Sequence, residues 1–335
     1  MMKKIKHFFN LLRIYLNYIL RKRHCPYLPV RLWVETSSRC NLACRLCVNK
    51  DVPKELKGDI SFELYKKIID EAKDFIFDVN LFHRGEPLLN DDIVKMVEYA
   101  NVKGIKTRIH TNATLLDERL SEDLIKAGLN LISFSFDGYS KETYEKNRVN
   151  ATYEKTLKNI KDFLSIKKSL LSNTPYTILQ VMEFDEELKK KDFKKQKEKF
   201  IKNFDGLGLD KMVIRTPHNW GGLLDIEGIE AVDKEKTKII PCTFPWYSLT
   251  VFYDGKVHLC PQDFEGEILL GDLNKENIRE VFNGKRIKEV RDRFAKRDVK
   301  GMDPCEGCDR IHRETVMGIP REYLKIFLKD SIRKD

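Results

Sequence analysis

Three closely spaced cysteines are the residues of this sequence best suited to chemistry. Cys40, Cys44 and Cys47 form a C-x3-C-x2-C pattern directly after Val30–Thr36, an apolar run that predicts a buried strand. The spacing lets all three sulfurs reach one inorganic cluster. A closed 4Fe–4S site has four cysteine ligands, so three thiolates would leave one iron open to a small molecule. A zinc loop, or thiols with a structural role, would fit the same spacing.

Four further cysteines lie in the C-terminal third, while Cys25 has no assigned role. The four are Cys242, Cys260, Cys305 and Cys308. Two β-rich runs joined by Asp254-Gly255 separate the first two, and this turn pair predicts a hairpin that brings them together. The last two follow a predicted helix at 278–294. Four cysteines can hold either a zinc ion or a second 4Fe–4S cluster with no open position.

Six predicted strands alternate with helices between residues 31 and 215. The strands are Arg31–Thr36, Asp78–His83, Ile105–His110, Leu131–Phe136, Tyr176–Met182 and Lys211–Arg215. The helices follow at 61–72, 91–102, 117–127, 153–170 and 186–204. This alternation predicts parallel βαβ units, and so an α/β fold whose sheet curls into a full or partial barrel. Active residues of such a barrel lie at the C-terminal ends of its strands.

Polar residues follow four of these strands. The segments are His83-Arg84-Gly85-Glu86-Pro87, Thr111-Asn112, Ser135-Phe136-Asp137-Gly138 and Arg215-Thr216-Pro217-His218. Gly85 lets the backbone approach a ligand, and Glu86 supplies a carboxylate acceptor beside it. Asp137 fits a turn best, because Asp-Gly is a common turn pair. Arg215 and His218 either face substrate or belong to a polar rim.

The cysteine pattern after the first strand and the motif after the second together resemble the radical S-adenosylmethionine (SAM) enzymes. In that family the open iron chelates the amino and carboxylate groups of SAM. Reductive cleavage then gives a 5′-deoxyadenosyl radical, which takes a hydrogen atom from substrate. The resemblance implies a partial (β/α)6 TIM-like barrel over about residues 30–216, with Cys40, Cys44 and Cys47 as cluster ligands.

The same resemblance implies a SAM site at the strand ends. Gly85, Glu86 and Pro87 match the family's Gly-Gly-Glu-Pro motif, which binds the SAM amino group. Ser135 matches a position that contacts the ribose, and Asn112 faces the same mouth. Two departures stand out: Arg84 replaces the first glycine, and Leu46 replaces the aromatic residue that often precedes the last cysteine.

The four C-terminal cysteines resemble Twitch, a short form of the SPASM domain that holds one auxiliary 4Fe–4S cluster. The predicted cofactors are therefore SAM and two 4Fe–4S clusters, with a flavodoxin or ferredoxin as electron donor. A cluster without an open iron is suited to accept the second electron of a substrate radical. We therefore expect a two-electron dehydrogenation of a hydroxyl-bearing carbon on a small molecule. The alternatives are maturation of a ribosomal peptide and a non-catalytic metal-binding scaffold.

Residues 1–24 carry seven Lys or Arg and no acid, out of a formal net charge of +10 for 335 residues. Within them, an apolar side runs opposite a narrow polar stripe, which is typical of a helix in a membrane interface or of a packing helix. The rest of the chain is nearly balanced in charge, which argues against nucleic acid as a partner. No run approaches the ~20 apolar residues of a membrane span. We expect a cytoplasmic protein, peripheral at the inner face of the membrane.

The expected organisation has five parts. An amphipathic helix at 1–24 precedes the barrel at 25–216, and a linker at 217–241 leads to the auxiliary cluster domain at 242–310. A C-terminal helix is predicted at 311–335.

Overall fold

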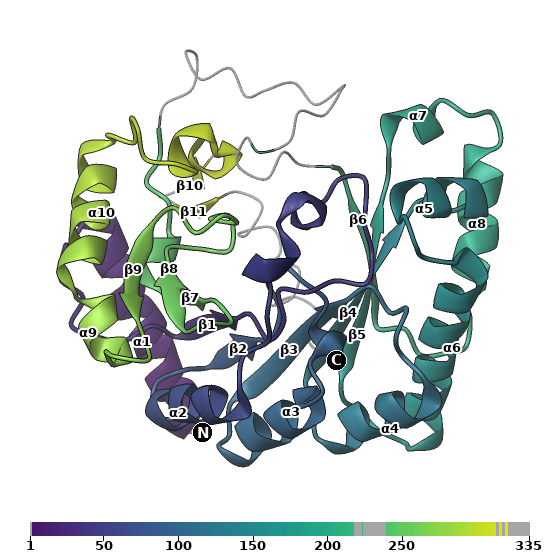
Figure 1. Ribbon diagram of the computed structural model, residues 1–335, viewed down its shortest axis with the longest axis horizontal. Coiled ribbons are helices and arrows are strands. Elements are labelled where there is room, and N and C mark those ends of the chain that lie inside the picture. The colour runs from purple at the N-terminus through teal and green to yellow at the C-terminus, as the bar shows by residue number, and fades with distance from the viewer. Residues whose placement is uncertain (1, 218–222, 224–238, 313–314, 317–318, 321–335) are drawn as a thin grey trace.

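Parallel strands in consecutive order form the centre of the molecule. The structure, a computed structural model, describes residues 2–217, 223, 239–312, 315–316 and 319–320. Among these residues, nine strands make one sheet in the order β6-β5-β4-β3-β2-β1-β7-β8-β9. Strands β1 to β6 are all parallel to their neighbours, and helices cover the outer side of this curved sheet (Figure 1). The predicted α/β fold with a partial six-stranded barrel is confirmed.

The barrel strands lie close to their predicted positions. They are β1 Arg31–Val34, β2 Asp78–Asn80, β3 Lys106–Thr111, β4 Leu131–Asp137, β5 Tyr176–Met182 and β6 Lys211–Arg215. The helices are α2 Phe62–Ala72, α3 Ile93–Val102, α4 Glu118–Lys126, α5 Lys141–Asn147, α6 Tyr153–Ser169, α7 Asp185–Leu188 and α8 Phe193–Lys202.

Local sequence explains where these helices begin. The Ser61 hydroxyl accepts a hydrogen bond from the Leu64 amide at 3.2 Å and so caps the N-terminus of α2. Asp117 caps α4 in the same way, accepting from the Leu120 amide at 2.7 Å. Each cap satisfies an amide that the first helical turn leaves without a partner.

Two predicted helices are each divided in the structure. The segment at 186–204 forms α7 and α8, because 189–192 has no apolar side chain to bury. The segment at 278–294 forms α9 Ile278–Phe282 and α10 Lys285–Lys296. Gly284 separates them, and a Cβ there would lie 2.8 Å from the Glu280 carbonyl oxygen. Helix α5 and strand β9 Leu269–Asp272 were not predicted.

The C-terminal region continues the barrel sheet. Strands β7 Ser248–Val251 and β8 Lys256–His258 form the predicted antiparallel hairpin, and β9 pairs with β8. Strand β7 also pairs in parallel with the whole of β1. The auxiliary region is thus joined edge to edge with the first barrel strand, a pairing that the sequence did not predict.

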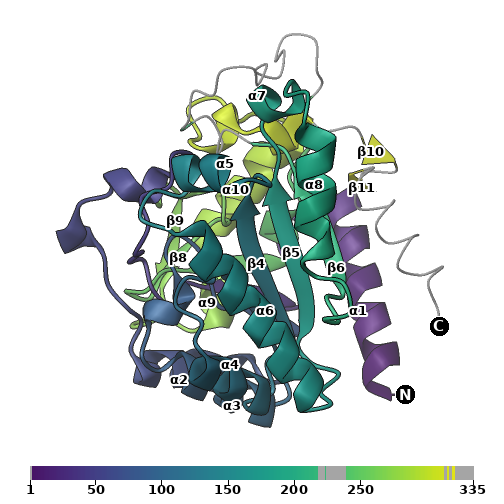
Figure 2. The ribbon, with the colours of Figure 1, turned by 90° about the vertical axis from the view of Figure 1, so that its right-hand side faces the viewer.

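Helix α1, Met2–Ile19, packs on the auxiliary region near its C-terminal end. Tyr18 is buried, with its ring edge-on to Trp246 at a centroid distance of 5.4 Å, and it donates to the Pro241 carbonyl at 2.8 Å. Figure 2 shows α1 along the margin of the molecule. Large apolar residues are left exposed in this segment, namely Phe9, Leu12 and Leu16 of α1 and Leu20 directly after it. Among the described helices, none is long and apolar enough to cross a membrane.

The described part of the C-terminal segment is not helical as predicted. A 3-10 turn occupies Asp309–His312, and β10 Thr315–Val316 pairs with β11 Ile319–Pro320 in antiparallel fashion. Residues 321–335, and most of the predicted linker at 217–241, lie outside the described residues.

Candidate active site

One cavity of about 360 Å³ opens at the C-terminal ends of the parallel strands. This size is within the range of small-molecule sites. Its wall includes the three cysteines of the loop after β1 and the residues that follow β2, β3 and β4. The sequence-predicted members are Cys40, Cys44, Cys47, Gly85, Glu86, Asn112 and Ser135.

Backbone hydrogen bonds hold the cysteine loop against the end of α5 and the residues directly after it. The Ala43 amide donates to the Val149 carbonyl at 3.1 Å, and the Arg45 amide donates to the Asn147 carbonyl at 2.8 Å. At the end of the loop, the buried Asn49 side chain donates to the Ser38 carbonyl at 3.1 Å. These contacts fix the loop that carries all three thiols.

The chemistry of these thiols fits a cluster with one open iron. Burial raises the pKa of each, that of Cys44 to about 11, although Arg148 nearby opposes the rise. The thiols are therefore protonated near neutral pH until a metal displaces their protons. Among the described residues that line this cavity, no fourth cysteine completes the set.

Gly85 lets the motif after β2 pack directly on the cysteine loop. A Cβ at this position would lie 2.3 Å from the Arg39 carbonyl oxygen and 2.4 Å from that of Ser37, both backbone atoms. The next amide, that of Glu86, donates to the same Arg39 oxygen at 2.8 Å. Only glycine permits this approach, so the motif and the cluster loop form one unit.

Glu86 is a buried carboxylate that faces the cavity. It accepts hydrogen bonds from the Thr111 hydroxyl and the Asn112 amide, both at 2.7 Å, and from the Leu88 amide at 3.1 Å. Burial nevertheless raises the pKa of Glu86 to about 7, because these hydrogen bonds only partly offset the loss of solvation. Pro87, buried behind it, begins a 3-10 turn that Glu86 caps.

Asn112 connects the motif after β3 to the cysteine loop. Its side-chain amide donates to Asn41 Oδ1 at 2.9 Å and lies 3.9 Å from the Cys40 sulfur. Ser135, on β4, lines the same cavity. The structure therefore gathers every predicted SAM contact except Pro87 onto one wall.

Arg84, the departure from the family motif, has a buried partner that the sequence analysis missed. Its guanidinium makes a two-pronged ion pair with Glu35, with Nε–Oε1 and Nη2–Oε2 distances of 2.7 Å. Burial alone would raise the pKa of Glu35, but the hydrogen bonds from Arg84, helped by His83 at 3.7 Å, outweigh it and lower the pKa to about 2. Glu35 also accepts from the Tyr253 amide at 3.2 Å, and so connects the barrel to the auxiliary region.

Of the two residues predicted to face substrate, the structure describes only Arg215. Arg215 is exposed at the end of β6, does not line the cavity, and donates to Gln180 Oε1 at 3.2 Å. His218 lies outside the described residues.

Other residues of the cavity wall were missed, among them His110, Arg148 and Gln180. Arg148 pairs with Asp137 at 3.1 Å, which gives that aspartate a role besides its turn. The position of His110 directly before Thr111-Asn112 was a usable signal. Gln180 lies in the middle of a strand, and no sequence motif beside it indicated a role in the site.

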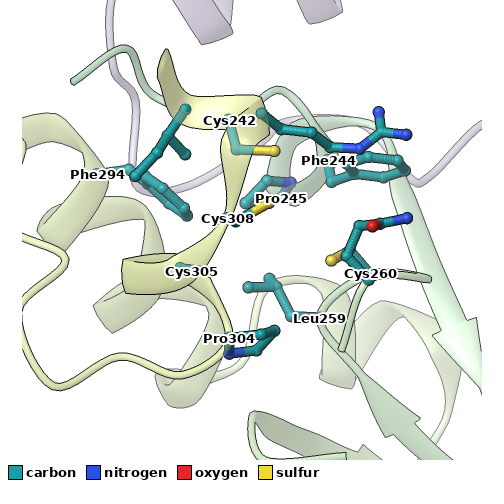
Figure 3. Close-up of a pocket in the computed structure, with 12 residues that line it drawn as sticks. Cys242, Phe244, Pro245, Leu259, Cys260, Phe294, Pro304, Cys305 and Cys308 are labelled. Carbon is teal, nitrogen blue, oxygen red and sulfur yellow. The ribbon is translucent and has the colours of Figure 1, made fainter. Parts of the chain in front are cut away.

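The other four cysteines line a small apolar cavity between the hairpin and the C-terminal turns (Figure 3). Burial raises the pKa of Cys260, Cys305 and Cys308, and neighbouring thiols raise it further for all three. Among the described residues, no three His, Cys, Asp or Glu side chains converge on a single ion position. The thiols surround a space instead, and this all-cysteine, apolar setting fits a cluster.

Two family models match the chain. That of the radical SAM superfamily matches residues 34–191, and that of the SPASM iron–sulfur cluster-binding domain matches residues 242–309. The chain belongs to the radical SAM superfamily. The radical SAM segment contains the cysteine triad and Glu86, and the SPASM segment spans the other four cysteines. Membership brings SAM and a 4Fe–4S cluster as cofactors, with further iron–sulfur binding in the SPASM segment.

Curated relatives match only part of this radical SAM protein. Fe-coproporphyrin III synthase of Methanosarcina barkeri is 37% identical over 120 residues, which are 36% of this chain and 30% of that protein. The chain spans about a third of the length of the first curated relatives it matches.

Two solved structures share the fold. BtrN, in complex with AdoMet and 2-DOIA, aligns with a TM-score of 0.58 and 18% identity over 85% of this chain and 94% of its own. Streptococcus suis SuiB, bound to precursor peptide SuiA, aligns with a TM-score of 0.62 and 14% identity over 81% and 68%.

Proposed function

We propose that this protein cleaves SAM reductively and thereby takes a hydrogen atom from a substrate. The observation that carries the proposal is the single cavity whose wall joins the cysteine triad to Glu86 and Asn112. The cluster and SAM, when bound, supply the electron and the carbon radical for that step. A scaffold without catalysis would need no buried carboxylate beside the cysteine loop.

The chain's own residues bind and orient these groups. Cys40, Cys44 and Cys47 hold the cluster. The Glu86 carboxylate oxygens accept a hydrogen bond from the SAM ammonium, using lone pairs that their three hydrogen bonds within the protein do not occupy. Asn112 and Ser135 supply polar contacts along the same wall.

We further propose a two-electron oxidation of a hydroxyl-bearing carbon. In such a reaction the substrate carbon would give up a hydrogen atom and its hydroxyl would release a proton to solvent, while SAM and the auxiliary cluster, when bound, would supply the hydrogen-atom acceptor and the acceptor for the second electron. A contact between the two sites supports this. His83, on the cavity wall, lies with Nε2 3.0 Å from the carbonyl oxygen of Pro261, the residue after Cys260. Cys242, Cys260, Cys305 and Cys308 would hold the accepting cluster.

Iron content and SAM cleavage test the first proposal. Anaerobic reconstitution should give about eight irons per chain, since each cluster has four. The variant with Cys40, Cys44 and Cys47 replaced by Ala should hold about four irons and form no 5′-deoxyadenosine under reduction. Formation of that product by the triple variant would contradict the assignment.

The oxidation is tested by removing the second cluster. With a candidate substrate, wild type should consume one SAM for each oxidised product. The Cys305→Ala/Cys308→Ala variant, checked for folding by circular dichroism, should lose product but keep SAM cleavage. Unimpaired oxidation would mean that the auxiliary region only shapes the pocket. Activity on a peptide alone would favour peptide maturation.

Two partners complete the proposal. A flavodoxin or ferredoxin would supply the low-potential electron. An anionic membrane surface at its cytoplasmic face would receive α1, whose exposed apolar side accompanies the seven cations of residues 1–24. Those cations disfavour pairing of this helix with a second copy of itself.

A further inference from the structure

His110 and Gln180 line the cavity from β3 and β5 but have no part in the proposed handling of SAM. The His110 ring lies nearly parallel to that of Phe82, with 4.0 Å between centroids and 9° between planes. Its Nδ1 is 3.5 Å from Gln180 Nε2. The orientation of this ring is therefore fixed by stacking on one side and by an amide at one edge.

Only one orientation of the Gln180 amide suits its neighbours. Its Oε1 accepts from Arg215 Nε at 3.2 Å, while its Nε2 donates to the Ser133 hydroxyl at 2.6 Å. A turned amide would place its NH₂ group against a guanidinium, which has donors only. Nε2 of Gln180 thus faces His110 as a donor. The His110 Nδ1 must then act as the acceptor, so the ring proton resides on Nε2.

The His110 ring is also uncharged. Burial, together with the nearby cations Arg215 and Arg108, lowers the pKa of His110 to about 3. A neutral imidazole in a buried site offers one N–H donor that can polarise an oxygen, without bringing a charge.

The charged side chains on the described cavity wall already have partners. Arg84 pairs with Glu35 and Arg148 pairs with Asp137, while Glu86, whose three hydrogen-bond donors are uncharged, is the group that we assign to the SAM ammonium. Apolar residues complete the wall, namely Phe82, Met182, Phe184 and Phe264. An ionised substrate group would therefore meet no free opposite charge among these residues, and its burial would be costly.

We infer that His110 donates its Nε2 proton in a hydrogen bond to an uncharged oxygen of the substrate, a hydroxyl or a carbonyl. Gln180 and Arg215 are positioning residues for that ring. The inference rests on the proposed function only for the place where substrate binds. The same donor suits the oxygen before and after oxidation. His110 does not take the hydroxyl proton, because Gln180 occupies its Nδ1.

Ring ¹⁵N chemical shifts of histidine-labelled, oxidised holoprotein test the tautomer without any substrate. The His110 signals are those absent from the His110→Gln variant. We expect an acceptor-type Nδ1 and a protonated Nε2 at neutral pH. In Arg215→Met the amide is free to turn, so the Nδ1–H tautomer should increase. A doubly protonated ring, an Nδ1–H tautomer in wild type, or no change in Arg215→Met would overturn the arrangement.

Four probes with one ring test the substrate class: cyclohexanol, cyclohexanone, cyclohexylammonium and cyclohexanecarboxylate. Ligand-detected NMR on oxidised, SAM-loaded holoprotein gives their dissociation constants. Cyclohexanol and cyclohexanone should bind at least about tenfold more tightly than the two ionised probes, because burial of an unpaired charge is disfavoured. Tighter binding of either ion, or no saturable binding of the neutral pair, would refute the inference.

Two variants show whether His110 is responsible. His110→Phe keeps a ring on Phe82 without a donor, and should weaken the neutral probes about fivefold. His110→Gln, whose amide N–H reaches the place of Nε2, should stay within about twofold of wild type. Equal loss in both variants would mean a packing role only. SAM cleavage by the wild type is measured separately, so its failure would refute the proposed function without affecting these results.

Discussion

Glu86 is a buried carboxyl group whose protonation should control SAM binding. The pKa of Glu86 is about 7 in the absence of a bound cation. An ammonium group beside the carboxyl favours its ionised form and so lowers this pKa. Binding below pH 7 must therefore release a proton. The association constant for SAM should rise with pH, by up to about tenfold per unit, and level off above about pH 7. Equilibrium binding to oxidised protein between pH 5.5 and 8.5 measures this.

Two variants separate this effect from general effects of pH. Glu86→Gln should bind SAM weakly and without the pH dependence. Glu187→Gln is the matched control, since Glu187 is also buried with a raised pKa but does not line the cavity. It should keep the wild-type profile. A pH-dependent Glu86→Gln protein would assign the titration to another group.

Single residues also mark where sequence reasoning stops. Gly85 was predicted to let the backbone approach a ligand, whereas the structure shows a different close approach, to the backbone of the cysteine loop. Arg84 appeared only as a departure from a motif. Its partner Glu35 is 49 positions away along the chain, and no local pattern connects them. A buried carboxylate at the end of a predicted strand did require a partner, but the sequence could not name it.

At the scale of elements, apolar runs between turn residues were enough to predict six strands and their parallel order. The pairing of β7 with β1 was not predictable, because long-range partners leave no local signature. Helix α5 was missed because its seven residues contain a single apolar side chain, Tyr144, and so show no periodic stripe.

Helix α1 carries a prediction about membranes. Phe9, Leu12, Leu16 and Leu20 are 57%, 42%, 46% and 62% exposed. Replacing Leu12 and Leu16 with Asp should weaken binding to anionic liposomes more than tenfold, since it removes buried apolar area and adds repelled charge. Co-sedimentation with phosphatidylglycerol vesicles measures this.

A control pair elsewhere on the surface makes the membrane result specific. Val102→Asp/Leu188→Asp also places two acids at exposed apolar positions, on α3 and α7. It should bind liposomes nearly as wild type does. Equal loss in both pairs would indicate a net-charge effect, and no binding by wild type would leave α1 as a packing helix.

For the whole molecule, the pair of Glu35 and Arg84 should couple the barrel to the auxiliary region. Glu35→Gln leaves a buried guanidinium without its counter-ion, which we expect to cost about 3–5 kcal/mol of stability. Thermal unfolding of anaerobic protein at one scan rate should show a midpoint several degrees lower. Asp162→Asn, which breaks an exposed pair with Lys158, should cost less than about 1 kcal/mol. Similar shifts in both variants would refute the coupling.

The parallel pairing of β1 with β7 has a consequence for synthesis on the ribosome. Strand β1 leaves the exit tunnel early, whereas β7 follows roughly 210 residues later, after roughly 10 to 40 seconds of elongation. During that interval one edge of β1 has no strand beside it, and such an edge can pair with other chains. A nascent chain that stalls before Ser248 would therefore keep its edge open. Completion of the auxiliary region ends this exposure.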